Sequence, residues 1–190
     1  MINVLFLLEG TQILMNIDQY KVSFPARENI FAVMKAATIH DLKQELTALQ
    51  PDKLIELFTR LARFKKENKE LLTYLLFEAH DEHGYIESVK KEIAFQFEAL
   101  PGPNLHLTKK SIRKILRIAN KHIRYTGSDQ AEAELLICFC KEIKKSKIPI
   151  HKSPALTNIY NRQLEKINKA VKLLHEDLQY DYVKIVSGEL

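Results

Sequence analysis

The stretch KKSIRKILRIANKHIR, residues 109–124, has the strongest pattern in this chain. It contains seven cations and no acidic residue. At roughly 100° per residue on an α-helix, these cations fall within roughly 140° of one another, and apolar residues fill the opposite side. The pattern therefore predicts an amphipathic helix with one buried face and one cationic face. The cations are Lys109, Lys110, Arg113, Lys114, Arg117, Lys121 and Arg124.

Helical spacing of apolar residues continues on both sides of this stretch. It predicts further helices over about 39–49, 51–64, 71–83, 85–100, 129–145 and 154–178, with the basic helix over about 109–125. Glycine (5) and proline (6) are scarce, which favours long helices joined by few loops. We therefore predict an all-α single domain of six or seven mostly antiparallel helices, arranged either as a bundle or as a short HEAT-like solenoid of helical hairpins.

The two ends of the chain differ from this helical domain, which we place at residues 34–180. Residues 1–33 have little helical period and form either a native N-terminal hairpin or arm, or an appendage outside the natural protein with translation starting at Met34. We expect residues 181–190 to form an extended or frayed tail.

Charge is divided unevenly along the chain, whose net charge is +5. Residues 105–152 hold 12 Lys and Arg against 4 Asp and Glu, whereas residues 67–98 hold 8 acids against three lysines. The acidic segment can therefore cover the basic helix within the protein, or the basic helix can face solvent and bind an anionic partner.

Cysteine usage and the start of the chain indicate a cytoplasmic protein. Cys138 and Cys140 lie two apart in a helical run and point roughly 200° apart, which suits neither a disulfide nor a metal clip. The apolar run at Met1–Leu8 has no cationic region before it and is interrupted by Glu9-Gly10. We therefore predict neither a signal peptide nor a transmembrane helix.

The stretch LFTRLARFKKENKELLTYLLFEA, residues 57–79, resembles the signature of a family of small uncharacterised bacterial helical proteins. The resemblance would extend from about Met34 to the C-terminus. That family has no assigned activity, so the resemblance implies no catalytic residue and no cofactor.

Three groups of residues are candidate sites. The cations Lys110, Arg113, Lys114, Arg117, Lys121 and Arg124 can bind phosphates or an acidic partner, although no aromatic residue lies within their arc to stack on bases. His80 and His83 can share a helical face and hold a metal, but polar residues also collect at helix ends, which is the more economical interpretation. Leu164, Ile167, Val171 and Leu174 form a 3-4-3 apolar seam suited to packing on another helix, including one from a second copy.

These candidates lead to three hypotheses, of which the first is a non-catalytic, cofactor-free interaction module. Its partner is another protein bound at the basic face, or a second copy bound at the seam. The alternative is sequence-nonspecific nucleic-acid binding through the basic helix, and the second alternative is a metal-dependent enzyme at His80 and His83. An anionic membrane surface is a disfavoured partner. The chain has no glycine-rich phosphate loop, serine nucleophile elbow or Cys-x-x-Cys pair.

Overall fold

The computed structural model describes residues 3–8, 11–16, 36–101 and 104–190 and divides the chain into two compact units, up to Pro51 and from Asp52. In the first unit, strands β1 (Asn3–Leu8) and β2 (Thr11–Asn16) pair antiparallel with Asn3 opposite Asn16. Helix α1 (Ile39–Ala48) begins with a capping box, in which Thr38 and Asp41 each accept the other's backbone N–H. The proposed start at Met34 lies outside the described residues.

The second unit begins with helices that bury little. Helix α2 (Pro51–Phe64) has Pro51 in its first turn, where proline is favoured, and is followed directly by α3 (Lys66–Thr73). Asn68 Nδ2 donates to the Leu61 carbonyl (2.9 Å) and fixes this corner. The chain continues as a π-helix, η2 (Tyr74–Glu78), and a 3₁₀ turn, η3 (Ala79–Asp81).

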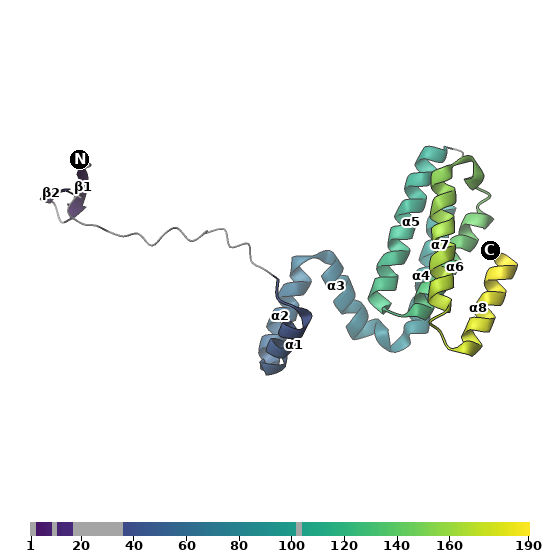
Figure 1. Cartoon of the computed structure of the whole chain (residues 1–190), viewed down its shortest axis with the longest axis horizontal. Helices are drawn as coiled ribbons and strands as arrows, with labels where there is room; N and C mark the ends of the chain where they lie inside the picture. The colour runs from purple at the N-terminus through teal and green to yellow at the C-terminus, as the bar shows by residue number, and fades with distance from the viewer. Residues whose placement is uncertain (1–2, 9–10, 17–35, 102–103) are drawn as a thin grey trace. The chain divides into compact units, whose positions relative to one another are not determined.

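The core lies among four helices, α4 (Glu82–Glu98), α5 (Leu105–Thr126), α6 (Asp129–Lys145) and α7 (Pro154–Val171). Figure 1 shows them side by side, with short connections that make consecutive helices antiparallel. Fully buried side chains come from each of them: Ile93, Ile112, Phe139 and Ile167. Because the four helices share one core, they form the bundle rather than the solenoid of the two predicted arrangements. The all-α prediction is confirmed for this part of the chain.

The ends of α5 show how local signals define a helix. Gly127 follows α5 with a φ of 62°, a left-handed conformation that favours glycine and ends the helix. The helix begins before the predicted start at residue 109. Asn104 caps it by accepting the backbone N–H groups of His106 and Leu107, and Thr108 is buried one turn inside the helix.

The end of the chain differs from the prediction. The expected single helix over 154–178 breaks after Val171, and the expected tail is part of a further helix, α8 (Glu176–Glu189). Gln179 Nε2 donates to the Leu174 carbonyl (2.7 Å) and stabilises the break. Helix α8 then lies against the bundle, where the Tyr160 hydroxyl donates to the Leu190 carbonyl (3.1 Å).

The prediction that the seam of Leu164, Ile167, Val171 and Leu174 is free for self-association is also wrong. Ile167 (0% exposed) and Val171 (4%) are buried in the protein's own core, and Leu164 packs against it. Leu174 lies beyond the end of α7, in the turn before α8. The 3-4-3 spacing was a sign of helix packing, but the neighbouring helices belong to the same chain.

Candidate functional site

The basic face is defined here as Lys110, Arg113, Lys114, Arg117, Lys121 and Arg124 on α5. The opposite side of the helix anchors it, because Ile112, Ile115 and Ala119 are completely or almost completely buried. All members of the face except Lys121 are exposed. Among the described residues, Lys121 is also the only member that forms an ion pair.

Among the described residues, one ion pair joins the acidic segment to the basic face. Lys121 Nζ lies 2.8 Å from Glu70 Oε2 on α3, and the Tyr125 hydroxyl donates to the same oxygen (2.9 Å). The hydrogen bond from Lys121 lowers the pKa of Glu70 to about 2, against the opposing effect of burial. The rest of the face is open to solvent, so the alternative of a fully paired face is wrong for the described residues.

Replacing Glu70 by glutamine is expected to change the acid stability of the protein. The pKa of Glu70 is lower in the folded protein than its ordinary value of 4.5, so the carboxylate stabilises the fold above about pH 4.5 and loses this effect as pH falls toward 2. We expect Glu70→Gln to lower the free energy of unfolding by about 1 kcal/mol at pH 7, because the pair is partly solvated. The difference from wild type should shrink at pH 3 in urea unfolding. Glu98→Gln, at an exposed site on α4, is the control, and an equal effect there would contradict the prediction.

A hollow of about 430 Å³ lies on the basic face and is lined by four of its members, Lys114, Arg117, Lys121 and Arg124. Ile118, Asn120 and Glu67 complete its lining. Four cations against one acid give this hollow a positive potential, which suits a phosphate group.

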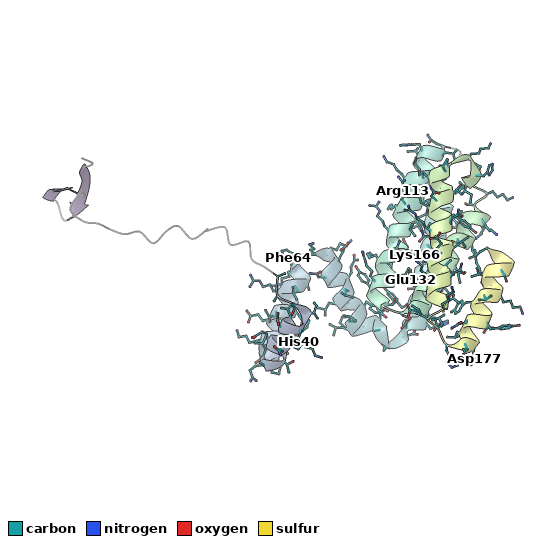
Figure 2. All side chains as sticks on the ribbon, viewed as in Figure 1. His40, Phe64, Arg113, Glu132, Lys166 and Asp177 are labelled. Carbon is teal, nitrogen blue, oxygen red and sulfur yellow. The ribbon has the colours of Figure 1, made fainter. Side chains whose placement is uncertain are left out.

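The positive surface continues onto α7, which the sequence reasoning missed. Lys166 Nζ donates to Asn120 Oδ1 (3.4 Å), so α7 lies beside the basic face, and Figure 2 shows Lys166 and Arg113 on these adjacent helices. Arg162 and Lys169 are exposed and, at four and three residues from Lys166, share its side of the helix. Lys166 therefore adds a cation beside the basic face, and Arg162 and Lys169 lie on the same side of α7. The i, i+4, i+7 spacing of Arg162, Lys166 and Lys169 is the signal that could have identified it.

A second, larger hollow of about 580 Å³ adjoins the basic face at Lys121, which lines both. Its wall is aromatic: Tyr74 and Tyr85 have ring centroids 4.6 Å apart, and His122 is 5.7 Å from Tyr85 and 5.8 Å from Tyr125. The Tyr85 hydroxyl and His122 Nδ1 lie 2.6 Å apart. Burial lowers the pKa of His122 and raises the pKa of Tyr85 to about 12, so both groups are neutral near pH 7.

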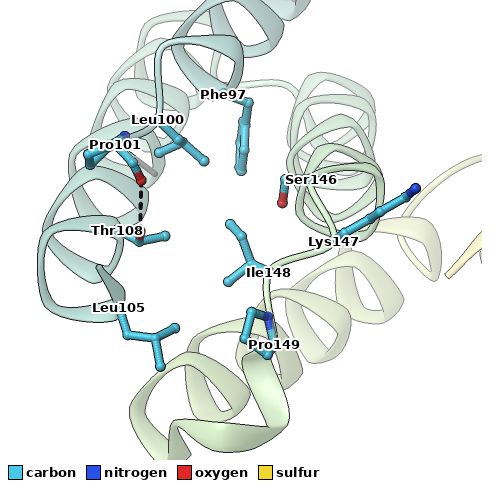
Figure 3. Close-up of a pocket in the computed structure, with 9 residues that line it drawn as sticks. All are labelled: Phe97, Leu100, Pro101, Leu105, Thr108, Ser146, Lys147, Ile148 and Pro149. Carbon is cyan, nitrogen blue, oxygen red and sulfur yellow. Dashed lines mark hydrogen bonds between the residues drawn. The ribbon is translucent and has the colours of Figure 1, made fainter. Parts of the chain in front are cut away.

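The bundle has another pocket at one end, of about 440 Å³, where Phe97, Leu100 and Leu105 face Ile148 and Pro149 (Figure 3). The Thr108 hydroxyl donates to the Pro101 carbonyl (3.3 Å) within it. Its described lining holds neither a carboxylate nor an imidazole. This pocket therefore offers apolar contacts but no acid–base pair.

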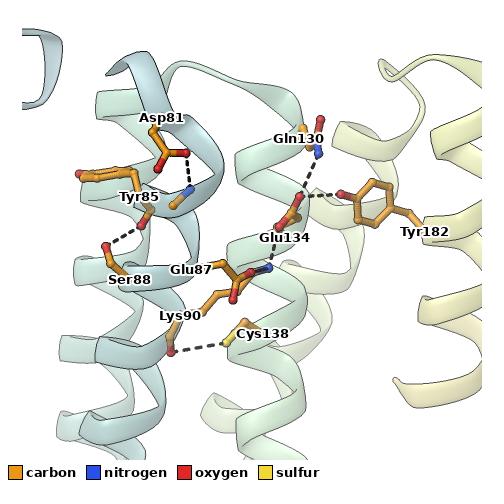
Figure 4. A network of polar contacts seen from close by, with 10 residues as sticks. Asp81, Tyr85, Glu87, Ser88, Lys90, Gln130, Glu134, Cys138 and Tyr182 are labelled. Atoms are coloured by element: carbon orange, nitrogen blue, oxygen red, sulfur yellow. Dashed lines mark hydrogen bonds and ion pairs between the residues drawn. The ribbon is translucent and has the colours of Figure 1, made fainter. Parts of the chain in front are cut away.

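A polar network joins α4, α6 and α8 on another side of the bundle (Figure 4). Glu134 accepts hydrogen bonds from Lys90 (2.6 Å), Gln130 (3.0 Å) and the Tyr182 hydroxyl (2.7 Å). Burial alone would raise the pKa of Glu134, but these hydrogen bonds outweigh it and lower that pKa. The network is saturated by its own members, and we interpret it as the attachment of α8 to the bundle.

The two cysteines lie in the same region and are both free thiols. Cys138 Sγ donates to the Lys90 carbonyl (3.9 Å), and Cys140 is completely buried. Burial raises the pKa of Cys138 to about 11 and that of Cys140 to about 12, so little thiolate is present near pH 7. Neither thiol is suited to act as a nucleophile.

The metal candidates do not gather further ligands. His80 in η3 and His83 in α4 are both exposed at the helix end where the sequence places polar residues. Within residues 36–101 and 104–190, no three His, Cys, Asp or Glu side chains lie close enough together to hold a metal ion.

Comparison with known proteins adds no assignment to this geometry: no family model, curated protein or solved structure matches the chain. The resemblance carried by residues 57–79 therefore remains a prediction. In the described part of the chain, no helix combines the length and the apolar character needed to cross a membrane.

Proposed function

We propose that this protein is a non-catalytic interaction module and that its basic face binds the phosphate backbone of nucleic acid without regard to sequence. The observation that carries this proposal is the open state of the basic face: five of its six cations are exposed and have no ion-pair partner among the described residues. Cations held apart from acids on a rigid helix release counterions when they meet phosphates, and this release is the main source of nonspecific affinity.

The shape of the surface supports a nucleic-acid strand over an acidic protein. Lys110 and Arg124 are separated by roughly 20 Å along α5, at 1.5 Å per residue, and Lys166 on α7 widens the surface. Between them the described residues include no exposed large apolar side chain. Stable protein interfaces have an apolar centre inside a polar rim, and this face lacks one.

The lack of base-edge contacts supports nonspecific binding. Asn120 is the only uncharged polar residue within the cationic arc, and its Oδ1 and Nδ2 are already engaged with Lys166 and the Leu116 carbonyl. Phosphate contacts position a protein on nucleic acid but carry no sequence information.

Salt dependence of binding tests this proposal. Fluorescence anisotropy with a labelled single-stranded oligonucleotide is expected to give a plot of log affinity against log salt with a slope of about −3 to −4, because each of about five phosphate contacts contributes about −0.7. Polyglutamate is the control ligand, because it offers negative charge without phosphates. Binding to the oligonucleotide that is insensitive to salt, or tighter binding to polyglutamate, would overturn the proposal.

A protein partner remains the second candidate, and α2 favours it. This helix buries none of its residues, and its large apolar side chains are exposed: Ile55, Leu57, Phe58, Leu61 and Phe64. An exposed apolar face of this extent is typical of protein–protein contact surfaces. It is separate from the basic face, so the two kinds of binding do not compete for the same residues.

A further inference from the structure

The aromatic pocket beside the basic face has the composition of a nucleotide site. It is defined here as the 580 Å³ hollow that adjoins the basic face at Lys121. Its lining combines four rings with charged and hydroxyl side chains: Tyr74, Tyr85, His122, Tyr125, Lys66, Lys69, Lys121, Glu70, Glu78, Thr73 and Ser88. Its volume is in the range of pockets that enclose small planar ligands. The rings form an unbroken series from Tyr74 through Tyr85 and His122 to Tyr125.

We propose that this pocket receives one unstacked base of a nucleic-acid strand whose phosphates lie in the adjoining hollow of Lys114, Arg117, Lys121 and Arg124. This inference rests on the proposed function and names the form of its ligand, a single-stranded or looped segment. Proteins that bind single strands combine a positively charged path for the backbone with aromatic side chains on which bases stack. Here Lys121 lies at the meeting point of these two parts.

The polar groups of the pocket support a base over a purely apolar ligand. His122 uses Nδ1 for the Tyr85 hydroxyl, and its Nε2 has no hydrogen-bond partner among the described residues. This ring nitrogen can donate to or accept from a base edge. Two carboxylates, Glu70 and Glu78, line the pocket against the three lysines Lys66, Lys69 and Lys121. Lys121 and Lys66 both pair with the Glu70 carboxylate, which reduces its repulsion of a strand.

The backbone around Tyr74 is unusual in the same place. Residues Tyr74–Glu78 form a π-helix between α3 and η3, and short π-helical segments are frequent at functional sites. The π-helix brings the buried Tyr74 against Tyr85 from α4. The pocket is therefore formed by residues of α3, η2, α4 and α5. The sequence pattern of α5 alone does not predict it.

An abasic strand provides the test, since it carries the same phosphates without bases. By fluorescence anisotropy at low salt, the full-length wild-type protein is expected to bind a short oligodeoxythymidine about tenfold more tightly than an abasic strand of equal length, because stacking of one base supplies this difference. Tyr85→Leu should abolish the difference without changing the affinity for the abasic strand. Tyr85→Phe keeps the ring and should keep the difference.

Other outcomes separate this inference from the proposed function. If the wild type binds both strands equally and with salt sensitivity, base binding in the pocket is overturned and phosphate binding stands. This comparison uses the wild-type protein alone, so it does not depend on the folding of a variant. Equal weakening of both strands by Tyr85→Leu would also overturn it, because a structural role predicts that result. Absence of salt-sensitive binding to either strand would overturn both proposals. If thymidine monophosphate displaces the labelled strand as well as an unlabelled strand does, the ligand is a mononucleotide, and the proposal that the pocket receives a base of a strand is overturned.

Discussion

Replacing Arg113, Arg117 and Arg124 by glutamate is expected to reduce affinity for nucleic acid about 100-fold or more. All three side chains are exposed on α5 and form no ion pair with any described residue, so their loss removes phosphate contacts without breaking the fold. Each reversal also places a negative charge against the phosphates. A total cost of about 3 kcal/mol corresponds to a factor above 100. Anisotropy titrations at fixed low salt measure the change, and the salt slope should fall toward zero.

A matched control distinguishes the basic face from the net charge of the protein. Lys91, Lys152 and Lys184 are also exposed and lie on α4, η4 and α8, and their replacement by glutamate changes the net charge by the same amount. We expect this variant to lose less than about tenfold in affinity, because distant charges are screened beyond about 10 Å at 0.1 M salt. Equal losses in both variants would show that overall charge, rather than this face, attracts the ligand.

The elements with strong local signals could be predicted from the sequence. Helix α6 runs from Asp129 to Lys145 as predicted, because the Ser128 hydroxyl accepts the Ala131 N–H at its start and apolar residues follow at helical spacing. The break after Val171 could not be predicted in the same way. The apolar spacing from Leu164 to Leu178 continues through it. The break is stabilised by the local hydrogen bond of Gln179 and by the docking of α8, and this docking depends on the tertiary contact between Tyr182 and Glu134.

The candidate site likewise has a part that the sequence predicts and a part that it does not. The basic face was predictable because its residues share one helix, and a single periodic pattern places them together. Its openness was not, since only the folded structure shows that, among the described residues, Glu70 is the one acid that forms an ion pair with this face. The position of the aromatic pocket beside this face could not be predicted for a related reason. Tyr74 and Tyr85 come from η2 and α4, so the absence of aromatic residues within the cationic arc did not exclude aromatic neighbours in space.

The largest expected loss of stability follows from removing the cation of the Lys90–Glu134 pair. Glu134 is only 11% exposed at its side chain, and Lys90 Nζ lies 2.6 Å from its carboxylate. Lys90→Met retains the length of the side chain but leaves a largely buried carboxylate with two neutral partners. We expect the free energy of unfolding to fall by about 3 kcal/mol, the order found when one member of a buried ion pair is removed. Urea unfolding at pH 7 measures this change.

The double variant Lys90→Met with Glu134→Gln is the control that identifies the cause. It removes the unpaired charge while keeping a side chain that can still bond to Gln130 and Tyr182, so most of the lost stability should return. The loss in Lys90→Met should also shrink as pH falls, because without Lys90 the pKa of Glu134 rises and the carboxylate becomes protonated more readily. If the double variant is as unstable as the single one, the loss comes from packing of the Lys90 side chain between α4 and α6, and the charge is not its source.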